Sequence, residues 1–135
     1  MTDEQLKHIL DTARTIATVG LSTNPDKPSY NIARYLVRHG YRVIPVNSSA
    51  DEILGMKSYP DLTAVPDRID VVQLFRPSEA VPPFVDQAIQ IGAKVVWMQE
   101  GISNEAAAAK ARAAGLQVVM DRCMRAEHRR LIGQK

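Results

Sequence analysis

Cysteine and aromatic residues are scarce in this sequence. Of its 135 residues, one is cysteine (Cys123), one is tryptophan and two are phenylalanine. A single cysteine cannot form a disulfide within the chain, which is typical of proteins that stay in the reducing cytoplasm. Only three scattered histidines accompany it, so the sequence also lacks the ligand spacing of a metal site.

Long hydrophobic runs are missing as well. No apolar stretch approaches the roughly 20 residues that a membrane-spanning helix needs. The opening segment, MTDEQLKHIL, carries charges where a secretory signal peptide has an apolar core. We therefore expect a cytoplasmic protein without a membrane partner.

A strong excess of one charge is absent, since the formal net charge is only +2. This value is too small to indicate a nucleic-acid partner by itself. The charge is uneven, because seven Lys or Arg residues from position 110 onward are balanced only by Asp121 and Glu127. The seven are Lys110, Arg112, Arg122, Arg125, Arg129, Arg130 and Lys135. Two interpretations are open, a basic patch and a solvated final helix, and we favour the helix.

The sequence does contain a repeated helix-to-strand rhythm. Three helical segments each end at a glycine, and a run rich in β-branched residues follows: IARYLVRHG before YRVIPVN, FVDQAIQIG before AKVVWMQ, and AAAAKARAAG before LQVVMD. Glycine suits the left-handed position that closes a helix. Strands that are apolar on both faces are typical of parallel sheets covered by helices. With 15–21 and 69–75, the sequence predicts five strands in a doubly wound, mainly parallel, three-layer α/β/α arrangement.

The segment 49–68 is less regular. We expect a short helix, then a minor edge strand near residues 56–59, then a turn-rich link. The edge strand would raise the sheet to six strands in the order 3-2-1-4-5-6. The length and the absence of a linker indicate a single domain over residues 1–135.

The ends of the predicted strands mark the expected ligand site. In an open α/β sheet, ligands bind beyond the carboxyl ends of the strands, where the strand order reverses. That crevice is expected between the strands at 15–21 and 69–75. The residues at the strand ends are 20–29, Val46 and Asn47, 75–77 and 99–102.

The loop 20–29 has the composition of an anion site. A helix that begins at Ser29 or Tyr30 directs unpaired N–H groups and the positive end of its dipole toward this loop. Ser22, Thr23 and Ser29 can each donate a hydroxyl hydrogen. Lys27 can add a charge, so phosphate is the expected ligand. The alternative is that Ser29 only caps the helix and Lys27 only faces water.

The signature of a dinucleotide site is missing. The glycine after Gly20 is Gly40, so there is no G-x-G-x-x-G pattern, and the P-loop pattern is absent too. The predicted second strand ends at Asn47, where a dinucleotide site has an acid that binds the ribose hydroxyls. Both departures argue against NAD or FAD.

Five segments carry a resemblance to a known family. They are TVGLSTNPDKPSYNIARYLVRHGYRVIPVN, ILGMKSYPDL, IDVVQLFRP, AKVVWMQEGISNEAA and GLQVVMDRCMRAEHRRL. In this order they resemble the small stand-alone CoA-binding proteins of bacteria and archaea, whose domain is similar to the N-terminal CoA-binding domain of the succinyl-CoA synthetase alpha subunit. The resemblance covers nearly the whole chain and implies a Rossmann-like fold with CoA across the predicted crevice. It departs at Ser48, where the family usually has proline, and this departure would loosen the loop after the second strand.

The resemblance also implies which residues hold CoA. The matching positions are Gly20, Leu21, Ser22, Lys27, Ser29, Tyr30, Val46, Asn47, Phe75, Arg76, Pro77, Gln99 and Gly101. The turn 20–22 and the helix start at 27–30 would contact the CoA phosphates. Val46 and Asn47 would border the nucleotide end, and residues 75–77 would form the opposite wall. Gln99 and Gly101 resemble the synthetase loop in which small residues let the ligand come close. A guanidinium at a strand end suits a phosphate. Arg76 could instead pair with Glu79, and Phe75 could belong to the core.

Cys123 and His128 lie near the end of the chain, and each has a predicted role. Cys123 directly follows the last predicted strand. As a free thiol it could meet the thiol of bound CoA and form a mixed disulfide. A lone cysteine is more often a small buried hydrophobe, and we favour that interpretation. His128, in AEHRRL, is predicted to be a surface residue rather than a catalyst.

Three functions remain open at this point. The first is a protein that binds CoA or an acyl-CoA without catalysis of its own, as a carrier, a sensor or the partner of an acyl-CoA enzyme. The second is a nicotinamide-dependent oxidoreductase, which the missing glycines and the missing acid disfavour. The third is a fragment of acyl-CoA synthetase chemistry, which would need a phosphorylatable histidine and a nucleotide-binding domain. We favour the first.

Overall fold

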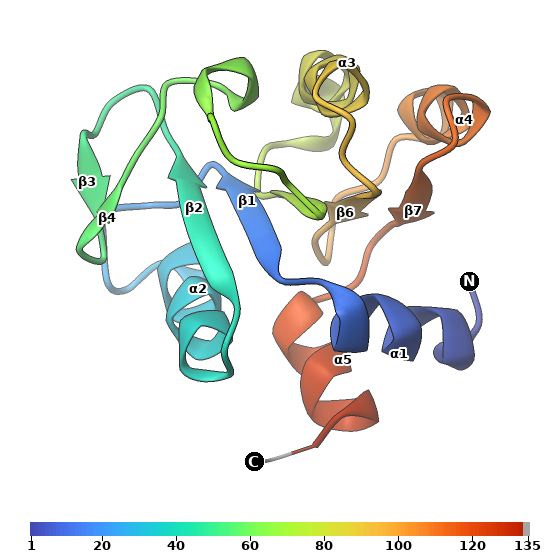
Figure 1. Cartoon of the computed structure of the whole chain (residues 1–135), viewed down its shortest axis with the longest axis horizontal. Coiled ribbons are helices and arrows are strands. Elements are labelled where there is room, and N and C mark those ends of the chain that lie inside the picture. The colour runs from blue at the N-terminus through green and yellow to red at the C-terminus, as the bar shows by residue number, and fades with distance from the viewer. Residues whose placement is uncertain (134–135) are drawn as a thin grey trace.

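A five-stranded sheet forms the middle layer of the structure, and helices cover both of its faces (Figure 1). The computed structural model describes residues 1–133, so Lys135, which the charge count includes, lies outside the described residues. The strands are β1 (Thr15–Val19), β2 (Arg42–Val46), β5 (Val71–Leu74), β6 (Val95–Met98) and β7 (Gln117–Val119). The helices are α1 (Asp3–Thr12), α2 (Pro28–Arg38), α3 (Pro82–Gln90), α4 (Glu105–Ala113) and α5 (Met124–Leu131).

The order of the strands is β2-β1-β5-β6-β7, and all pairs are parallel. This order confirms the predicted doubly wound, Rossmann-like α/β fold. Val19 at the end of β1 pairs with Val46 of β2 on one side and with Leu74 of β5 on the other. The strand order therefore reverses between β1 and β5, where the crevice was expected.

Alternate residues of the central strands enter two separate hydrophobic cores. Val72 and Leu74 of β5 belong to the core on the side of α3 and α4, whereas Val71 packs with Trp97 toward α1, α2 and α5. All residues of β5 and β6 are buried. Burial of each such aliphatic side chain contributes about 1.5–3 kcal/mol, so the two cores hold the strand ends in fixed positions.

A chain of hydrogen bonds runs through the apolar interior. The Thr18 hydroxyl donates to Gln73 Oε1 at 2.8 Å, and Gln73 Nε2 donates to Gln99 Oε1 at 3.0 Å. The backbone N–H of Met124 donates to the same oxygen of Gln99 at 3.1 Å. A buried polar group left without its partner costs about 1–3 kcal/mol, so this chain fixes β1, β5 and the end of β6 relative to the start of α5.

Three of the helices, α2, α3 and α4, end where the glycine rhythm predicts. Gly40, Gly92 and Gly115 follow α2, α3 and α4 with positive φ angles.

None of the helices described over residues 1–133 combines the length and the apolar character that crossing a membrane would require.

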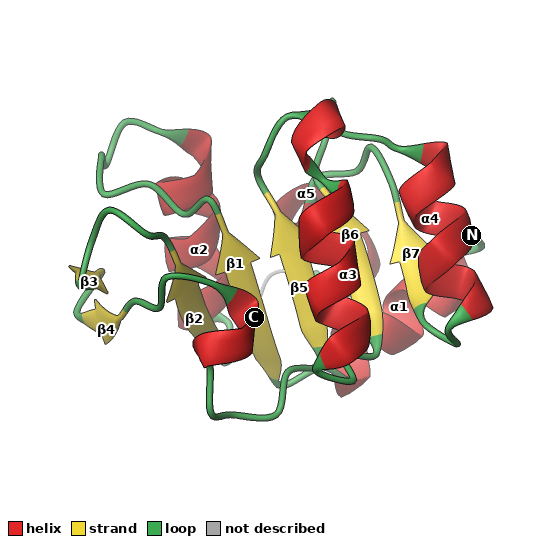
Figure 2. Cartoon of the chain, turned by 90° about the horizontal axis from the view of Figure 1, so that it is seen from above, coloured by secondary structure: helices red, strands yellow, loops and turns green. Residues whose placement is uncertain are grey.

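The segment 49–68 differs from the prediction. The expected short helix is replaced by β3 (Glu52–Ile53) and β4 (Met56–Lys57), an antiparallel hairpin outside the main sheet, and a 3-10 turn, η1 (Leu62–Ala64), follows (Figure 2). Leu54 and Gly55, between the two strands, have φ angles of 56° and 73°. Two positive φ angles in a two-residue loop are typical of the turn that closes a tight hairpin.

The predicted sixth strand at 56–59 is reduced to a single bridge. Tyr59 N–H donates to Pro45 O at 3.0 Å, and Asn47 N–H donates to Tyr59 O at 2.9 Å. The next bond along this edge would need an N–H on Pro45, because the N–H and C=O of one strand residue point to the same side. Proline has no N–H, so the pairing stops there and the predicted edge strand was wrong.

His128 lies inside the protein, so the prediction of a surface residue was wrong. Its side chain is 4% exposed, and its Nδ1 lies 2.8 Å from the Tyr35 hydroxyl oxygen. The ring of His39 meets it edge-on, with centroids 5.0 Å apart. Burial lowers the pKa of His128, and the neighbouring His39 lowers it further.

This burial predicts a loss of stability in mild acid. The unfolded chain binds a proton on His128 below about pH 6.5, whereas the folded chain binds it only at lower pH. The stabilisation is therefore present above that value and is lost as the pH falls toward the folded pKa. Urea unfolding between about pH 8 and 5 should show this decline in the free energy of unfolding, and His128→Gln should flatten it. His8→Gln, at an exposed position of α1, is the control and should keep the wild-type slope. An equal slope in His128→Gln would contradict the prediction.

Candidate ligand site

Gly20, directly after β1, brings three strand ends together. Its φ angle is +83°, and a Cβ atom there would lie 3.2 Å from the backbone oxygen of Phe75 and 3.3 Å from Cδ of Arg76. Its N–H donates to the oxygen of Val46 at 3.0 Å. The ends of β2, β1 and β5 therefore meet at a residue without a side chain, and this contact forms the floor of the site.

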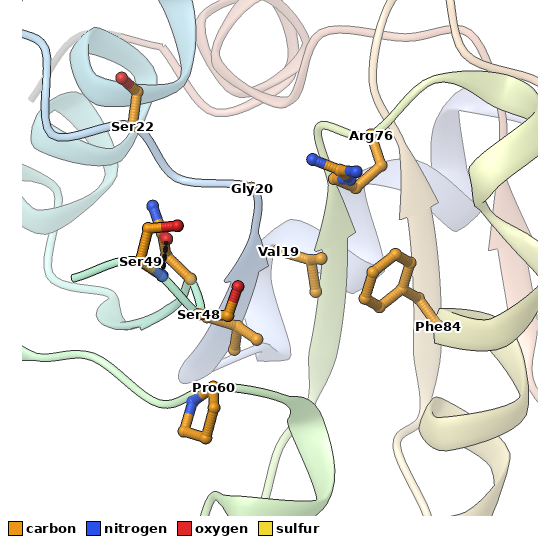
Figure 3. A pocket seen from close by; sticks show the side chains of 10 residues that line it. Val19, Gly20, Ser22, Ser48, Ser49, Pro60, Arg76 and Phe84 are labelled. Carbon is orange, nitrogen blue, oxygen red and sulfur yellow. Dashed lines mark hydrogen bonds between the residues drawn. The ribbon is translucent and has the colours of Figure 1, made fainter. Parts of the chain in front are cut away.

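A cavity of about 420 Å³ lies beyond these three ends. The residues that line it are Val19, Gly20, Ser22, Val46, Asn47, Ser48, Ser49, Pro60, Arg76 and Phe84. Figure 3 shows Arg76 and Phe84 on one side, with Ser48 and Ser49 across from them. The cavity is thus at the predicted reversal of the strand order, and it combines an arginine, hydroxyl groups and an aromatic ring.

A second cavity, of about 310 Å³, adjoins the first. It is lined by Gly20, Ser22, Lys27, Pro28, Ser29 and Phe75. Gly20 and Ser22 line both cavities, so the turn after β1 is their shared border. We call the two adjoining cavities together the crevice from here on.

The loop between β1 and α2 is held by its own side chains. Ser22 N–H donates to the Ser29 hydroxyl oxygen at 3.0 Å, and Asn24 N–H donates to the Ser22 hydroxyl oxygen at 3.0 Å. The helix begins at Pro28, earlier than the predicted start, because proline is favoured in the first turn. Lys27 is the N-cap residue, and its side chain makes no capping hydrogen bond. Ser29 therefore ties the loop to the helix instead of capping it.

Asn47 connects the two loops on the β2 side of the crevice. Its Nδ2 donates to the oxygen of Leu21 at 2.9 Å, and its Oδ1 accepts from the N–H of Ser49 at 2.7 Å. A carboxylate has no hydrogen to donate to Leu21, so an acid here would break this connection. The requirement for an amide explains why the acid of a dinucleotide site is absent.

Arg76 and Lys27 bring positive charge that no acid neutralises. Within residues 1–133, no carboxylate lies within 4.0 Å of either side chain, and the proposed ion pair of Arg76 with Glu79 is not formed. Both side chains line the crevice and are exposed. An anion entering the crevice would meet unpaired cations from two sides.

Most of the predicted binding residues come together, and five do not. Gly20, Ser22, Val46, Asn47, Arg76, Lys27, Ser29 and Phe75 line the crevice. Leu21, Tyr30, Pro77, Gln99 and Gly101 line neither cavity. Leu21 is fully buried, and the Gln99 side chain is 3% exposed and bonded within the interior. Phe75 is half-buried and packs against the core while it also lines the crevice; its contact with CoA stays a prediction.

Six lining residues were not among the predicted binding residues: Val19, Pro28, Ser48, Ser49, Pro60 and Phe84. Ser48 and Ser49 follow Asn47 just beyond β2, so the rule that ligands meet strand ends could have found both as candidates. Phe84 lies on α3 and Pro60 follows the bridge to β2, and no local signal in the sequence links either residue to the crevice.

No cysteine lines the crevice in the described part of the chain. Within residues 1–133, no three His, Cys, Asp or Glu side chains are grouped so that they could hold a metal ion. Cys123 is half-buried before α5 and lines neither cavity. Its mixed disulfide with CoA stays a prediction.

The fold and the crevice define a Rossmann-like α/β protein with a crevice at the reversal of strand order. Residues 14–129 match the family model described as a CoA binding domain. The chain belongs to this family, which confirms the resemblance found in the sequence.

The relatives occur as short chains and as parts of long ones. The chain is 37% identical over 124 residues to the uncharacterized protein YneT of Bacillus subtilis, with 92% of each chain covered. It is 45% identical to a solved structure of a hypothetical protein from Pyrococcus horikoshii, with a TM-score of 0.96 and coverage of 98% of this chain and 94% of that one. It is also 34% identical over 95 residues to the ADP-forming acetate–CoA ligase II of Archaeoglobus fulgidus. That match covers 68% of this chain but only 14% of the ligase.

The contact at Gly20 predicts a steric effect beyond backbone strain. Gly20→Ala should destabilise the protein by about 2–3 kcal/mol, because the new Cβ would press on the fixed carbonyl of Phe75. Gly92→Ala is the matched control, since Gly92 has a φ of +74° and nothing within 4 Å of the Cβ position. It should cost only about 1 kcal/mol, from the strained backbone alone. Urea unfolding measures both values, and equal losses would show that the approach to Phe75 is unimportant.

Proposed function

We propose that this protein binds CoA or an acyl-CoA in the crevice and catalyses no reaction by itself. One observation carries the proposal: Arg76 and Lys27 both line the crevice beside the hydroxyl-bearing loop that follows Gly20. Within residues 1–133, neither side chain has a carboxylate within 4.0 Å. Membership of the CoA-binding domain family supports the same ligand. A protein of this kind would serve as a carrier, a sensor or the partner of an acyl-CoA enzyme.

The CoA diphosphate is proposed to bind at the border of the two cavities. The first turn of α2 offers backbone N–H groups at Ser29 and Tyr30 that the helix cannot satisfy itself. The dipole of the helix adds positive potential at the same end. Ser22 lines both cavities and Lys27 lies beside one of them, so a phosphate there would have neutral and charged donors.

The nucleotide end is proposed to occupy the larger cavity. Phe84 and Pro60 provide apolar surface for a base, and the Ser48 and Ser49 hydroxyls lie beside it. The bonds that Asn47 makes to Leu21 and Ser49 keep this wall in place. NAD is disfavoured, because no carboxylate lines the cavity to bind a ribose diol.

Ligand selectivity tests the proposal directly. CoA should bind more tightly than NAD, and dephospho-CoA should bind through the same diphosphate contacts. Ser22→Ala combined with Ser29→Ala should weaken CoA binding by at least tenfold, because each hydrogen bond to a charged phosphate contributes about 1.5–3 kcal/mol. Ser103→Ala, at an exposed serine outside the crevice, is the control and should bind as the wild type does. Calorimetric titration decides the matter, and tighter binding of NAD than of CoA would overturn the assignment.

The absence of catalysis is a separate prediction. No histidine lines either cavity, so within the described residues the crevice lacks the usual proton-transfer group. The protein alone should not turn over ATP with acetate and CoA, nor NADH with carbonyl substrates. Both assays should stay at background, and turnover of about 1 s⁻¹ or faster would contradict the prediction.

A further inference from the structure

A third cavity lies away from the crevice and is lined by residues of α2 and α5 and by His39, directly after α2. The two helices lie on the same face of the sheet (Figure 1). The volume of this cavity is about 330 Å³, and it shares no lining residue with the crevice. The residues that line it are Asn31, Arg34, Tyr35, Arg38, His39, Arg125 and Arg129. Four guanidinium groups and a histidine thus surround one hollow, and they come from two helices far apart in the sequence. We call it the arginine cavity.

No acid neutralises the arginine cavity. Within residues 1–133, none of its four arginines has a carboxylate within 4.0 Å. Arginines elsewhere do find such partners: Arg42 pairs with Asp67, and Arg130 pairs with Asp3. Among residues 1–133, the only side-chain acceptor for Arg34 is the neutral amide of Asn31, at 2.9 Å. Like charges held together in this way repel one another, and a bound anion would remove that repulsion.

Stacked rings hold the inner side of the arginine cavity. The rings of Tyr35 and His39 stack with centroids 4.0 Å apart, and the Tyr35 hydroxyl is hydrogen-bonded to the buried His128. The guanidinium of Arg129 lies 4.9 Å from the centre of the Tyr35 ring. This arrangement fixes Tyr35 in place and Arg129 over it, so part of the cationic surface is preorganised.

We propose that the arginine cavity is a second anion site that binds a compact polyphosphate group, independently of the crevice. Guanidinium groups present paired N–H donors that match phosphate oxygens, and several of them can serve a diphosphate at once. The volume is within the range of small-molecule sites. A hollow between two helices favours a small anion over an acidic protein surface, which would need a flat patch to lie against.

Inorganic pyrophosphate is the probe for this site. Calorimetry measures its affinity, and the Nε–Hε signals of the arginines in nuclear magnetic resonance spectra show where it binds. Arg34→Gln and Arg129→Gln, on different helices, should each weaken binding by about fivefold, the effect of losing one exposed charge pair. Arg112→Gln is the matched control, because Arg112 is an exposed helix residue, on α4, outside this cavity and also without a carboxylate within 4.0 Å. It should leave the affinity unchanged.

Two alternatives compete with the proposal: pyrophosphate binds in the crevice instead, or the arginine cavity docks an acidic protein instead of a small anion. The same variants distinguish these alternatives from the proposal. Signals of Arg34 and Arg129 that shift with pyrophosphate, and affinity that survives Arg76→Gln, support the proposal. Shifts confined to Arg76, with binding lost in Arg76→Gln, would overturn it in favour of the crevice. Absence of any shift at millimolar pyrophosphate would overturn it as well. Binding of polyglutamate but not of pyrophosphate at Arg34 and Arg129 would replace it with a protein-docking surface.

Discussion

The close approach of Gly20 to Phe75 and Arg76 is the constraint on which the crevice depends. With no Cβ at this position, the end of β1 lies against the end of β5 while its N–H holds β2. Arg76 follows β5, whereas Lys27 and the hydroxyl-bearing residues of the crevice follow β1 and β2. One contact therefore decides how far apart the groups that line the crevice stand, and both cavities share the turn that it fixes.

The fold was predictable because its signals are local and repeated. Each helix that ends at a glycine and each strand that is apolar on both faces reports its own structure within about ten residues. The hairpin of β3 and β4 has only two residues in each strand, too few for a periodic pattern. Pro45 within a predicted strand was a usable signal against an edge partner, and the prediction of a sixth strand overlooked it.

The residues of the crevice were predictable where the strand order alone determines their position. Gly20, Val46, Asn47 and Arg76 each stand at a strand end, and the strand order brings those ends together. Phe84 reaches the crevice from a helix, so only the packed structure reveals it. The prediction that His128 lies at the surface failed for a similar reason. Its neighbours in the sequence are polar, but its ring points inward to Tyr35.

The missing N–H of Pro45 has a consequence for growth of the sheet. The end of the β2 edge is already paired with Tyr59, and Pro45 in that edge has no N–H to donate to a new strand. This edge therefore resists both aggregation and strand exchange between copies. In the part of the chain that the structure describes, β7 is the edge without such a block. The two edges of the sheet therefore differ in their donors, since a proline interrupts the edge of β2 and the three residues of β7, Gln117–Val119, include none.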